Sequence, residues 1–346
     1  MVGPKGGAAG SGETVCVTGA SGYIASWLVK ILLSRGYTVH GTVRDLSDKK
    51  TGHLKQLENA SENLKLFKAD LVDYDAMAAA IMGCQGVFHV ATPVPSGKIT
   101  DPEREMLSPA VNGTTNVLKA ASAANVRRVV VVSSMVAVEI NPKDWPKDKI
   151  KDESCWSDKE FCRNNEDWYS VAKITSEEAA LEYGKQTGLD VVTVNPAVVF
   201  GPLLQPTLNT SCQFLVYFLK GGPGQMRNKL WHIVDVRDTA ESLLLVYETP
   251  EASGRHICAP HVISARDLLD LLKNMYSDEY PFMSKESINY MDHPAPMTSD
   301  KLKKLGWKVR PLEETIADTV EFCKKAGFLE DVEGTPFRFP DVYNKI

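Results

Sequence analysis

A glycine-containing turn between a strand-like run and a helical run is the feature that most constrains the fold of this chain. The apolar run Thr14–Val17 is followed by TGASGYIA at residues 18–25, which opens an amphipathic pattern extending to Ser34. In such a turn the first glycine allows a sharp reversal, and the second lets the backbone approach a pyrophosphate closely. The helix start then offers free N–H groups and a partial positive charge to the anion. The residues expected to contact a dinucleotide here are Gly19, Ser21, Gly22, Tyr23 and Ile24.

Strand-like and helical patterns alternate through the first half of the chain. The strand-like runs are Thr14–Val17, Thr38–Val43, Leu64–Lys68, Gly86–Ala91, Val129–Ser133 and Val191–Asn195. The helical runs between them are Ile24–Ser34, Asp75–Met82, Pro109–Ala123 and Trp168–Gln186. Apolar strands that alternate with helices favour a parallel sheet covered on both faces. The sequence therefore predicts an α/β fold, a doubly wound parallel sheet of the Rossmann type.

The alternation weakens after Pro196, where prolines and glycines become frequent. Trp231–Val234 reads as a further strand and Thr239–Tyr247 as a helix, and we expect this piece to return to the main sheet. The remaining segments would form a smaller lobe over the carboxyl ends of the strands, where ligands bind in such sheets. The predicted division is a disordered tail over 1–12, an NADP-binding domain over 13–196 and 231–260, and a substrate lobe over 197–230 and 261–346.

Charge and composition argue against several kinds of partner. The chain of 346 residues has a formal net charge of −5 and no block of Lys and Arg, so we expect neither a nucleic acid nor a membrane partner. No apolar run reaches the roughly 18 residues that a membrane span needs. Seven cysteines, an odd number, favour reduced thiols and a cytoplasmic location. The sequence leaves a monomer and a dimer both open.

The end of the second strand-like run indicates which dinucleotide is bound. An NAD site usually carries a carboxylate there, whereas this chain has Arg44, followed by Asp45. The planar fork of an arginine grips two oxygens of a 2′-phosphate, and Lys50 would add a second positive charge. We therefore expect NADPH or NADP+. The alternatives are that Arg44 and Lys50 are solvated surface charges, or that Asp45 pairs with Arg44.

Two further strand ends supply candidate cofactor contacts. Asp70 ends the third strand-like run, where it would either accept a hydrogen bond from the adenine amino group or cap the following helix. Small side chains at the end of the fourth run would leave room for a ribose. The cofactor residues expected from these two ends are Asp70, Leu71, Val90, Ala91 and Thr92.

Tyr169 and Lys173 lie one helical turn apart, which places both on one face of a helix. A free tyrosine has a pKa near 10, and we expect the neighbouring ammonium to lower that pKa. Tyr169 would protonate the oxygen of a carbonyl that receives a hydride, and Lys173 would also hold the nicotinamide ribose. Ser134, at the end of the fifth strand, would bind the same oxygen. Ser133 beside it should point in the opposite direction, because side chains alternate along a strand.

This order of parts is what a hydride-transfer site needs, and the chain resembles the extended short-chain dehydrogenase/reductases from about Glu13 to about Phe328. More narrowly it is similar to the plant cinnamoyl-CoA reductase and dihydroflavonol reductase group. The matching pieces are Val17–Gly22, Ile24–Lys30, Thr42–Asp45, Phe88–Pro93, Ser133-Ser134, Tyr169 with Lys173, and Asn195–Gln205, and Cys155–Cys162 looks most like the cinnamoyl-CoA reductase branch. The resemblance implies NADPH, a Ser134/Tyr169/Lys173 centre and an aromatic phenylpropanoid thioester or carbonyl substrate. It also implies cofactor contacts at Ser133, Pro196, Ala197 and Val199.

Two positions depart from the pattern of that group. The residues between the tyrosine and the lysine read Ser170-Val171-Ala172, where cinnamoyl-CoA reductases typically carry Cys-Tyr-Gly. Five residues after Ser134 the group usually has an uncharged substrate-facing residue, whereas this chain has Glu139. That carboxylate would bind a substrate hydroxyl, repel an acidic substrate, or turn to solvent. The residues expected around the substrate are Ser134, Glu139, Tyr169, Met226, Tyr290 and Met297.

Other readings stay open on the sequence alone. A sugar-nucleotide epimerase or dehydratase shares the scaffold, and a cofactor-sensing regulatory partner is the non-enzyme alternative. Cys155 and Cys162 are either a reversible disulfide or two unrelated thiols. His256, Cys258 and His261 are metal-ligand residue types that lie where a strand should end, so we expect no metal. His89, on an apolar strand, reads as a hydrogen-bonded core histidine.

Overall fold

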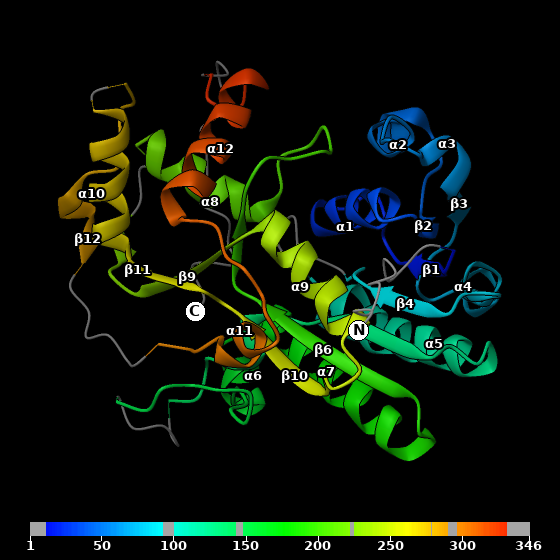
Figure 1. Cartoon of the computed structure of the whole chain (residues 1–346). Coiled ribbons are helices and arrows are strands. Elements are labelled where there is room, and N and C mark those ends of the chain that lie inside the picture. Colours follow the sequence, from blue (N-terminus) through cyan, green and yellow to red (C-terminus); the bar gives the residue numbers. More distant parts are fainter. Residues whose placement is uncertain are drawn as a thin grey trace, which may run out of the picture.

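The computed structural model describes residues 12–92, 100–142, 148–221, 225–277, 279–289 and 296–330. Its main sheet has seven strands in the order β10-β6-β5-β4-β1-β2-β3, and every neighbouring pair is parallel (Figure 1). The strands are β1 Thr14–Val17, β2 Thr38–Val43, β3 Leu64–Lys68, β4 Gly86–His89, β5 Arg128–Val132, β6 Asp190–Pro196 and β10 Gly254–Cys258. The predicted parallel α/β fold is confirmed. The predicted disordered tail lies almost wholly outside the described residues.

Helices cover both faces of this sheet. The helices are α1 Tyr23–Ser34, α2 Asp48–Lys55, α3 Ala60–Asn63, α4 Tyr74–Ile81, α5 Ser108–Ala123, α6 Lys159–Asn164, α7 Trp168–Thr187, α8 Thr210–Leu219, α9 Val236–Glu248, α10 Ala265–Tyr276, α11 Asp300–Lys304 and α12 Leu312–Lys325. Alternate residues of each strand face opposite helix layers. Val130 and Val132 of β5 belong to the core that contains α1 and α9, whereas Val129 and Val131 belong to the core that contains α4 and α5.

A smaller sheet has the order β11-β9-β7, built from β7 Val198–Phe200, β9 Leu230–Asp235 and β11 His261–Ser264. The expectation that Trp231–Val234 returns to the main sheet is wrong, because these residues belong to β9. The strand that returns is β10, which extends the sheet beside β6. Helix α9, which follows β9, does pack on the main sheet beside α1. The apolar pattern identified a strand but did not identify its partner strand.

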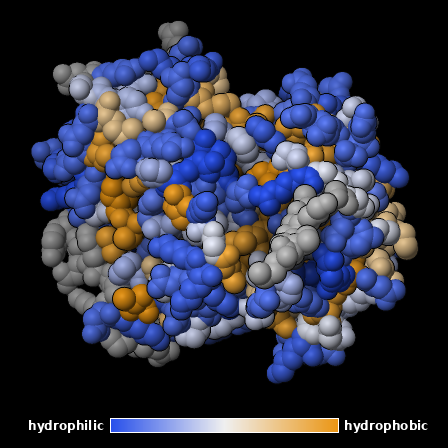
Figure 2. All heavy atoms as spheres, in the orientation of Figure 1, coloured by the Kyte–Doolittle hydropathy of each residue, from blue (hydrophilic) through white to orange (hydrophobic). Residues whose placement is uncertain are grey.

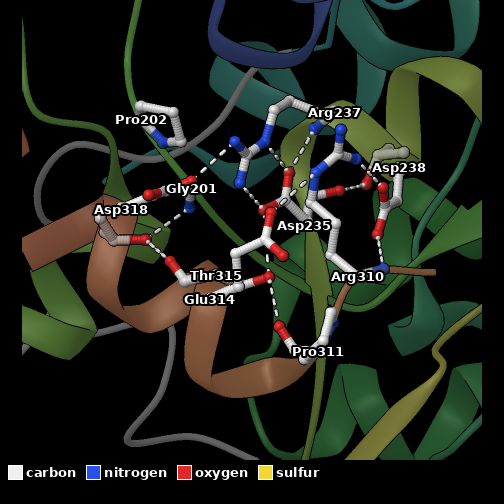
Figure 3. Close-up of polar contacts among 12 residues, drawn as sticks. Gly201, Pro202, Asp235, Arg237, Asp238, Arg310, Pro311, Glu314, Thr315 and Asp318 are labelled. Atoms are coloured by element: carbon white, nitrogen blue, oxygen red, sulfur yellow. Dashed lines mark hydrogen bonds and ion pairs between the residues drawn. The ribbon is translucent and has the colours of Figure 1, made fainter. Parts of the chain in front are cut away.

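A polar joint fastens the small sheet to the start of α1. Tyr23 Oη donates to the Gly201 carbonyl (2.8 Å), and Gly201 N donates to Thr319 Oγ1 of α12 (2.7 Å). The buried carboxylate of Asp235, at the end of β9, accepts from Arg237 (2.7 Å) and from Thr315 Oγ1 (3.0 Å). Figure 3 shows Asp235, Arg237 and Thr315 gathered near Gly201. The glycine turn and the small sheet are therefore held in one fixed relation.

The surface of the face shown in Figure 2 is mostly hydrophilic, and its hydrophobic residues appear in scattered groups. The chain has ordinary proportions of both kinds, with 43% hydrophobic and 24% charged residues. Among the described helices, none combines the length and the apolar character that a membrane-spanning segment requires.

Candidate active site

The glycine turn after β1 forms a tight cradle at the carboxyl edge of the main sheet. Gly22 N donates to Gly19 O (2.8 Å), and Gly19 has a φ of +65°, which favours glycine. A Cβ at Gly19 would lie 2.9 Å from the Cβ of Ala91, so the turn packs directly against the end of β4. The first backbone N–H groups of α1 have no partner within the helix. This geometry suits a pyrophosphate.

Tyr23 has a different role from the one its position suggests. Its hydroxyl is used in the joint with Gly201, and Cys212 Sγ lies 3.6 Å from the same oxygen. The side chain therefore points away from the cradle, and only the backbone of Tyr23 remains available to a phosphate. Ser21 and Ile24 are half-buried beside it.

Two cations stand where the 2′-phosphate is expected. Arg44 follows β2 directly, Lys50 lies in α2, and both are exposed. Asp45 Oδ1 accepts from Ser47 N (2.9 Å), and that hydrogen bond lowers the pKa of the Asp45 carboxyl. Among the described ion pairs none joins Arg44 to Asp45.

His53 is a candidate that the sequence reasoning missed. It lies in α2 near the backbone of Ser21, and both of its ring nitrogens are buried without a hydrogen-bond partner in the described structure. Burial lowers the pKa of His53, and the Ser21 backbone opposes that shift. The available signal was its place one helical turn after Lys50, on the same side of the helical run.

The ends of β3 and β4 carry the remaining adenine-side and ribose-side candidates. Asp70 is exposed and accepts from Val72 N (3.2 Å). The alternative that Asp70 caps the following helix is wrong, because Asp73 caps α4 by accepting from Ala76 N (3.0 Å). The carbonyl of Leu71 accepts from Asn116 Nδ2 (3.0 Å), which fixes this turn to α5.

His89 is the hydrogen-bonded core histidine that the sequence predicted. Its ring nitrogens lie 3.0 Å from Thr18 Oγ1 and 3.0 Å from Thr114 Oγ1. Burial, with a smaller contribution from Lys173, lowers the pKa of His89 to about 3. The Thr18 hydroxyl also accepts from the amides of Val90 and Ala91 (3.1 and 3.0 Å), which holds the strand end open.

A small cavity joins that strand end to the predicted reacting groups. Its lining includes His89, Ala91, Thr92, Thr114, Ser133, Lys173, Ser176 and Glu177. The structure thus brings Ala91, Thr92, Ser133 and Lys173 together, although they come from three different parts of the sequence. Lys173 Nζ donates to the carbonyl of Val132 at the end of β5 (3.0 Å).

Tyr169 lies in the first turn of α7, which Asp167 caps by accepting from Ser170 N (3.2 Å). Ser170 Oγ also donates to Asp167 Oδ2 (2.5 Å), so the serine that departs from the group's pattern has a structural role. The Ser134 side chain lies near enough to the Tyr169 phenol to lower its pKa, whereas Ser133 Oγ donates in the other direction to Glu177 Oε2 (2.7 Å). The opposite orientation predicted for the two serines is confirmed.

The expected acidification of Tyr169 by Lys173 is not found. Burial raises the pKa of Tyr169 to about 12, the hydrogen bond with Ser134 lowers it, and Lys173 is not among the causes. Burial also lowers the pKa of Lys173 to about 8, and the charge of Glu177 opposes that shift. The physical reason is that the Lys173 ammonium is directed at the Val132 carbonyl. A phenol with a raised pKa stays protonated at neutral pH, which is the form that a proton donor needs.

The substrate side of the site contains an unsatisfied acid. Glu139 follows the short 3-10 helix Met135–Ala137, and its Oε1 is buried without a hydrogen-bond partner in the described structure. Burial raises the pKa of Glu139, while the charges of Lys229 and Lys151 lower it. Of the three alternatives for this residue, orientation toward solvent does not agree with the buried oxygen.

The other predicted substrate and nicotinamide residues are largely buried. Met226 and Met297 are buried in the core against which Tyr169 packs, and Tyr290 lies outside the described residues. Pro196 ends β6, and Ala197 N donates to Cys258 O of the neighbouring β10 (3.0 Å). The predicted nicotinamide contacts Pro196, Ala197 and Val199 therefore sit at the junction of the two sheets.

Comparison with known proteins identifies the family. The model of the NAD dependent epimerase/dehydratase family matches residues 15–259. This chain belongs to that family. It is 47% identical over 321 residues to cinnamoyl-CoA reductase 1 of Petunia hybrida, covering 92% of this chain and 94% of that protein. It is 46% identical to cinnamoyl-CoA reductase 1 of Arabidopsis thaliana, covering 92% and 91% of the two chains.

Solved structures agree with these relatives. Vestitone reductase from alfalfa superposes with a TM-score of 0.79 at 33% identity, covering 91% of this chain and 99% of that one. Yeast methylglyoxal/isovaleraldehyde reductase Gre2, solved in complex with NADPH, gives a TM-score of 0.79 at 29% identity, with the same coverage. The predicted resemblance to the extended short-chain dehydrogenase/reductases and to the cinnamoyl-CoA reductase group is confirmed.

The cysteine and histidine candidates form no obvious centre. Cys155 and Cys162 are both free and buried, and they belong to different apolar clusters. Cys258 Sγ contacts Ser242 Oγ (3.5 Å), whereas His261 Nε2 pairs with the Arg310 carbonyl (2.7 Å). In the part of the chain that the structure describes, no group of three or more His, Cys, Asp or Glu side chains is arranged to hold a metal ion.

Proposed function

We propose that this protein is an NADPH-dependent reductase of aromatic phenylpropanoid substrates, most simply one that converts a hydroxycinnamoyl-CoA thioester to the aldehyde. The observation that carries the proposal is the placement of Ser134 beside the Tyr169 phenol, together with the buried Lys173 one helical turn away. This centre lies at the carboxyl edge of a sheet whose first turn is a phosphate cradle. The 47% identity to a cinnamoyl-CoA reductase supports the substrate class.

The residues present fit NADPH. The glycine turn has room for no Cβ at Gly19 because Ala91 lies against it, and Arg44 and Lys50 offer two exposed cations to a 2′-phosphate. We assign the nicotinamide end to Lys173, Ser133 and the segment 196–199, and the adenine end to Asp70 and Leu71. When bound, NADPH supplies the hydride that adds to the carbonyl carbon.

The protein's own groups then act on the carbonyl oxygen. Ser134 holds that oxygen, and Tyr169 gives it the phenolic proton as negative charge develops there. With a thioester this step gives a tetrahedral hemithioacetal. As its C–S bond breaks, the hydroxyl gives up its proton, and the sulfur takes up a proton and leaves as the CoA thiol, so that the aldehyde remains. Lys173 stabilises the phenolate that remains and holds the ribose. Burial of the site excludes water from the reacting carbon.

Free aromatic aldehydes and dihydroflavonols form a second substrate class, and Glu139 fits them as well as it fits a CoA thioester. Its buried, unpartnered oxygen suits a substrate hydroxyl, and such hydroxyls occur on aromatic aldehydes and dihydroflavonols as well as on CoA esters. The chain is also 39% identical to a bifunctional dihydroflavonol 4-reductase/flavanone 4-reductase of Malus domestica. NADPH oxidation should be measured with feruloyl-CoA, coniferaldehyde and dihydroquercetin side by side. Turnover of feruloyl-CoA well above the other two supports the thioester assignment.

The same assay separates the remaining alternatives. An epimerase or dehydratase returns its hydride and would show no net consumption of NADPH. A regulatory partner would bind NADPH without turnover of any of the three compounds. The cytoplasmic location, the division into two domains and the choice between monomer and dimer stay predictions.

Replacement of Tyr169 by phenylalanine tests the proton donor. Tyr169→Phe should reduce turnover about a hundredfold or more, because general acid catalysis contributes that much, while NADPH still binds. The matched control is Tyr183→Phe on the same helix, whose hydroxyl contacts Ser122 Oγ (3.1 Å) far along α7. The control should keep its activity. Near-normal turnover by Tyr169→Phe would contradict the assignment.

A further inference from the structure

A third residue of α7 is aligned with Tyr169 and Lys173. Glu177 lies one further turn along the same helix, at the i, i+4, i+8 spacing that places three side chains on one face. It is completely buried, and with Lys173 and Ser133 it lines the cavity beside the active site. A buried carboxylate is costly unless it is paired and hydrogen-bonded, so its partners reveal its role.

Glu177 is the centre of a dense set of hydrogen bonds. Oε1 accepts from Arg255 Nε (2.9 Å) and Thr193 Oγ1 (2.6 Å). Oε2 accepts from Ser133 Oγ (2.7 Å), Asn195 Nδ2 (2.8 Å) and an Arg255 terminal nitrogen (3.3 Å). These donors come from β6, from β10 and from Ser133, the residue that follows β5, so one carboxylate joins α7 to three neighbouring strands of the sheet.

Two of these contacts lead directly to the Ser134 backbone. Ser133 is the residue before Ser134, and Asn195 Nδ2 also donates to the Ser134 carbonyl (3.2 Å). Glu177 therefore fixes the position of the hydroxyl that hydrogen-bonds Tyr169, without touching the phenol itself.

Arg255 extends the same network toward the substrate side. Its terminal nitrogens donate to the carbonyls of Ala137 (3.2 Å), Glu153 (3.1 Å) and Cys155. Its guanidinium also stacks on Trp156, with Cζ 3.7 Å from the ring centroid. The ion pair thus connects the catalytic helix to the segment 153–156 and to the turn that precedes Glu139.

Glu177 also acts on Lys173 through its charge. The Lys173 residue has a relative exposure of 6%, and burial disfavours the charged form of its ammonium. The negative charge one turn away offsets part of that penalty and raises the pKa of Lys173. Without it, a smaller fraction of Lys173 would be protonated near neutral pH.

We propose that the Glu177–Arg255 pair positions the catalytic centre: Glu177 fixes Ser134 and places a negative charge one helical turn from Lys173, while Arg255 ties the 153–156 segment to the same helix. The inference rests on the proposed function, because it takes Ser134, Tyr169 and Lys173 as the reacting set. A pair that only stabilised the fold would make the same hydrogen bonds, but its loss would not change the titration of Lys173.

The test is Glu177→Gln, which preserves the size of the side chain and removes its charge. The alkaline limb of kcat/KM should move to lower pH by about one unit or more, and kcat/KM at pH 8 should fall by about five- to fiftyfold. The matched control is Thr193→Val, which removes one hydrogen bond to Glu177 and leaves its charge. The control should be less stable to heat but keep the wild-type pH profile. The proposal is overturned if the Glu177→Gln profile coincides with the wild-type profile, or if Thr193→Val moves it equally.

A second readout does not depend on turnover. The dissociation constant of NADPH should be measured by fluorescence across the same pH range. As the pH rises, this constant should begin to increase at a lower pH in Glu177→Gln than in the wild type, because charged Lys173 holds the ribose. If Glu177→Gln does not fold, Glu177→Asp is the second variant, because its shorter side chain keeps the charge but moves it away from Lys173. Glu177→Asp should shift the kcat/KM profile and the NADPH-binding profile in the same direction by a smaller amount. Unshifted profiles in Glu177→Asp would then overturn the proposal.

The two measurements also separate this inference from the proposed function. If the wild type binds NADPH but reduces none of the three test compounds, while Glu177→Gln shifts the binding profile, the proposed function fails and the positioning role stands. If the wild type reduces feruloyl-CoA and Tyr169→Phe does not, but the Glu177→Gln profiles coincide with those of the wild type, the positioning role fails and the proposed function stands.

Discussion

At the scale of single residues, the site depends on neighbours that face opposite ways. Ser134 reaches the Tyr169 phenol, and Ser133 reaches Glu177, because successive side chains at a strand end point to opposite sides. The same two-residue segment therefore contributes one group to the proposed chemistry and one to the structure that supports it.

Arg44 is the residue that should distinguish NADPH from NADH. Arg44→Ala should weaken NADPH binding about ten- to a hundredfold, since a hydrogen-bonded charge pair contributes roughly 1.5–3 kcal/mol, and should leave NADH binding nearly unchanged. Dissociation constants for both cofactors can be measured by fluorescence. The control is Arg35→Ala, which removes an arginine at the C-terminal end of α1, the end that lies away from the glycine turn. Equal losses for the two cofactors in Arg44→Ala would contradict the phosphate assignment.

The pH dependence should reflect Lys173 before Tyr169. The pKa of Lys173 is lowered to about 8, so its charged form persists below that pH and is lost as the pH rises through it. The pKa of Tyr169 is raised to about 12, so the proton donor remains protonated throughout that range. We expect kcat/KM for the reduction to fall above about pH 8, measured from pH 6 to 10. A flat profile to pH 10 would show that the charge of Lys173 is not needed.

Residue types and spacing predicted the reacting set but not its surroundings. Tyr169 and Lys173 could be predicted from the sequence because they are one helical turn apart, and Ser134 could be predicted because it follows a strand. The contact of Arg255 with Glu177 could not be predicted, since the two residues are distant in sequence and only the pairing of β10 with β6 brings them together. The raised pKa of Tyr169 also could not be predicted, because it depends on burial of the phenol and on the direction in which Lys173 Nζ points.

At the scale of elements, close packing of helices on the main sheet leaves little room at particular glycines. Gly86, in β4, lies under the ring of Tyr247 from α9, and a Cβ there would overlap that ring. Gly86→Ala should lower the free energy of unfolding by about 1–3 kcal/mol, as overpacking of a core does. Denaturant titration measures the change.

Gly52, in α2, provides the matched control for this prediction. A Cβ at Gly52 meets nothing within 4 Å, so Gly52→Ala should raise the helix propensity and leave the protein equally stable or about 0.5–1 kcal/mol more stable. Equal destabilisation by both substitutions would mean that the contact with Tyr247 is not the cause.

The elements were more predictable than their partners. Six of the seven strands of the main sheet followed from strand-like runs that alternate with helical runs, and most of these runs are apolar because the strands are buried. Trp231–Val234 has the same apolar character, yet it pairs in the small sheet, since β7 takes it up directly after Pro196 ends β6. Local pattern determines the strand, and the available edges determine its neighbour.

At the scale of the whole molecule, the two sheets are connected at two places that bear on the site. One is the joint in which Tyr23, Gly201 and α12 meet beside Asp235 (Figure 3). The other is the junction where β6 ends at Pro196 and β7 begins at Val198. The first connection holds the start of α1 beside the glycine turn, and the second carries the predicted nicotinamide contacts Pro196 and Ala197, so the relative placement of the sheets bears on the geometry of the site.

The chain order of Glu177 and Arg255 has a consequence for biosynthesis. A nascent polypeptide that has emerged only as far as α9 already contains Tyr169 and Lys173, but the guanidinium that neutralises Glu177 is still within the ribosome. The Glu177 carboxylate would remain in the interior without the Arg255 guanidinium as its counterion until Gly254–Cys258 docks at the sheet edge. Competence for catalysis should therefore arrive with the last strand of the main sheet to be translated, rather than with the helix that bears the reacting side chains.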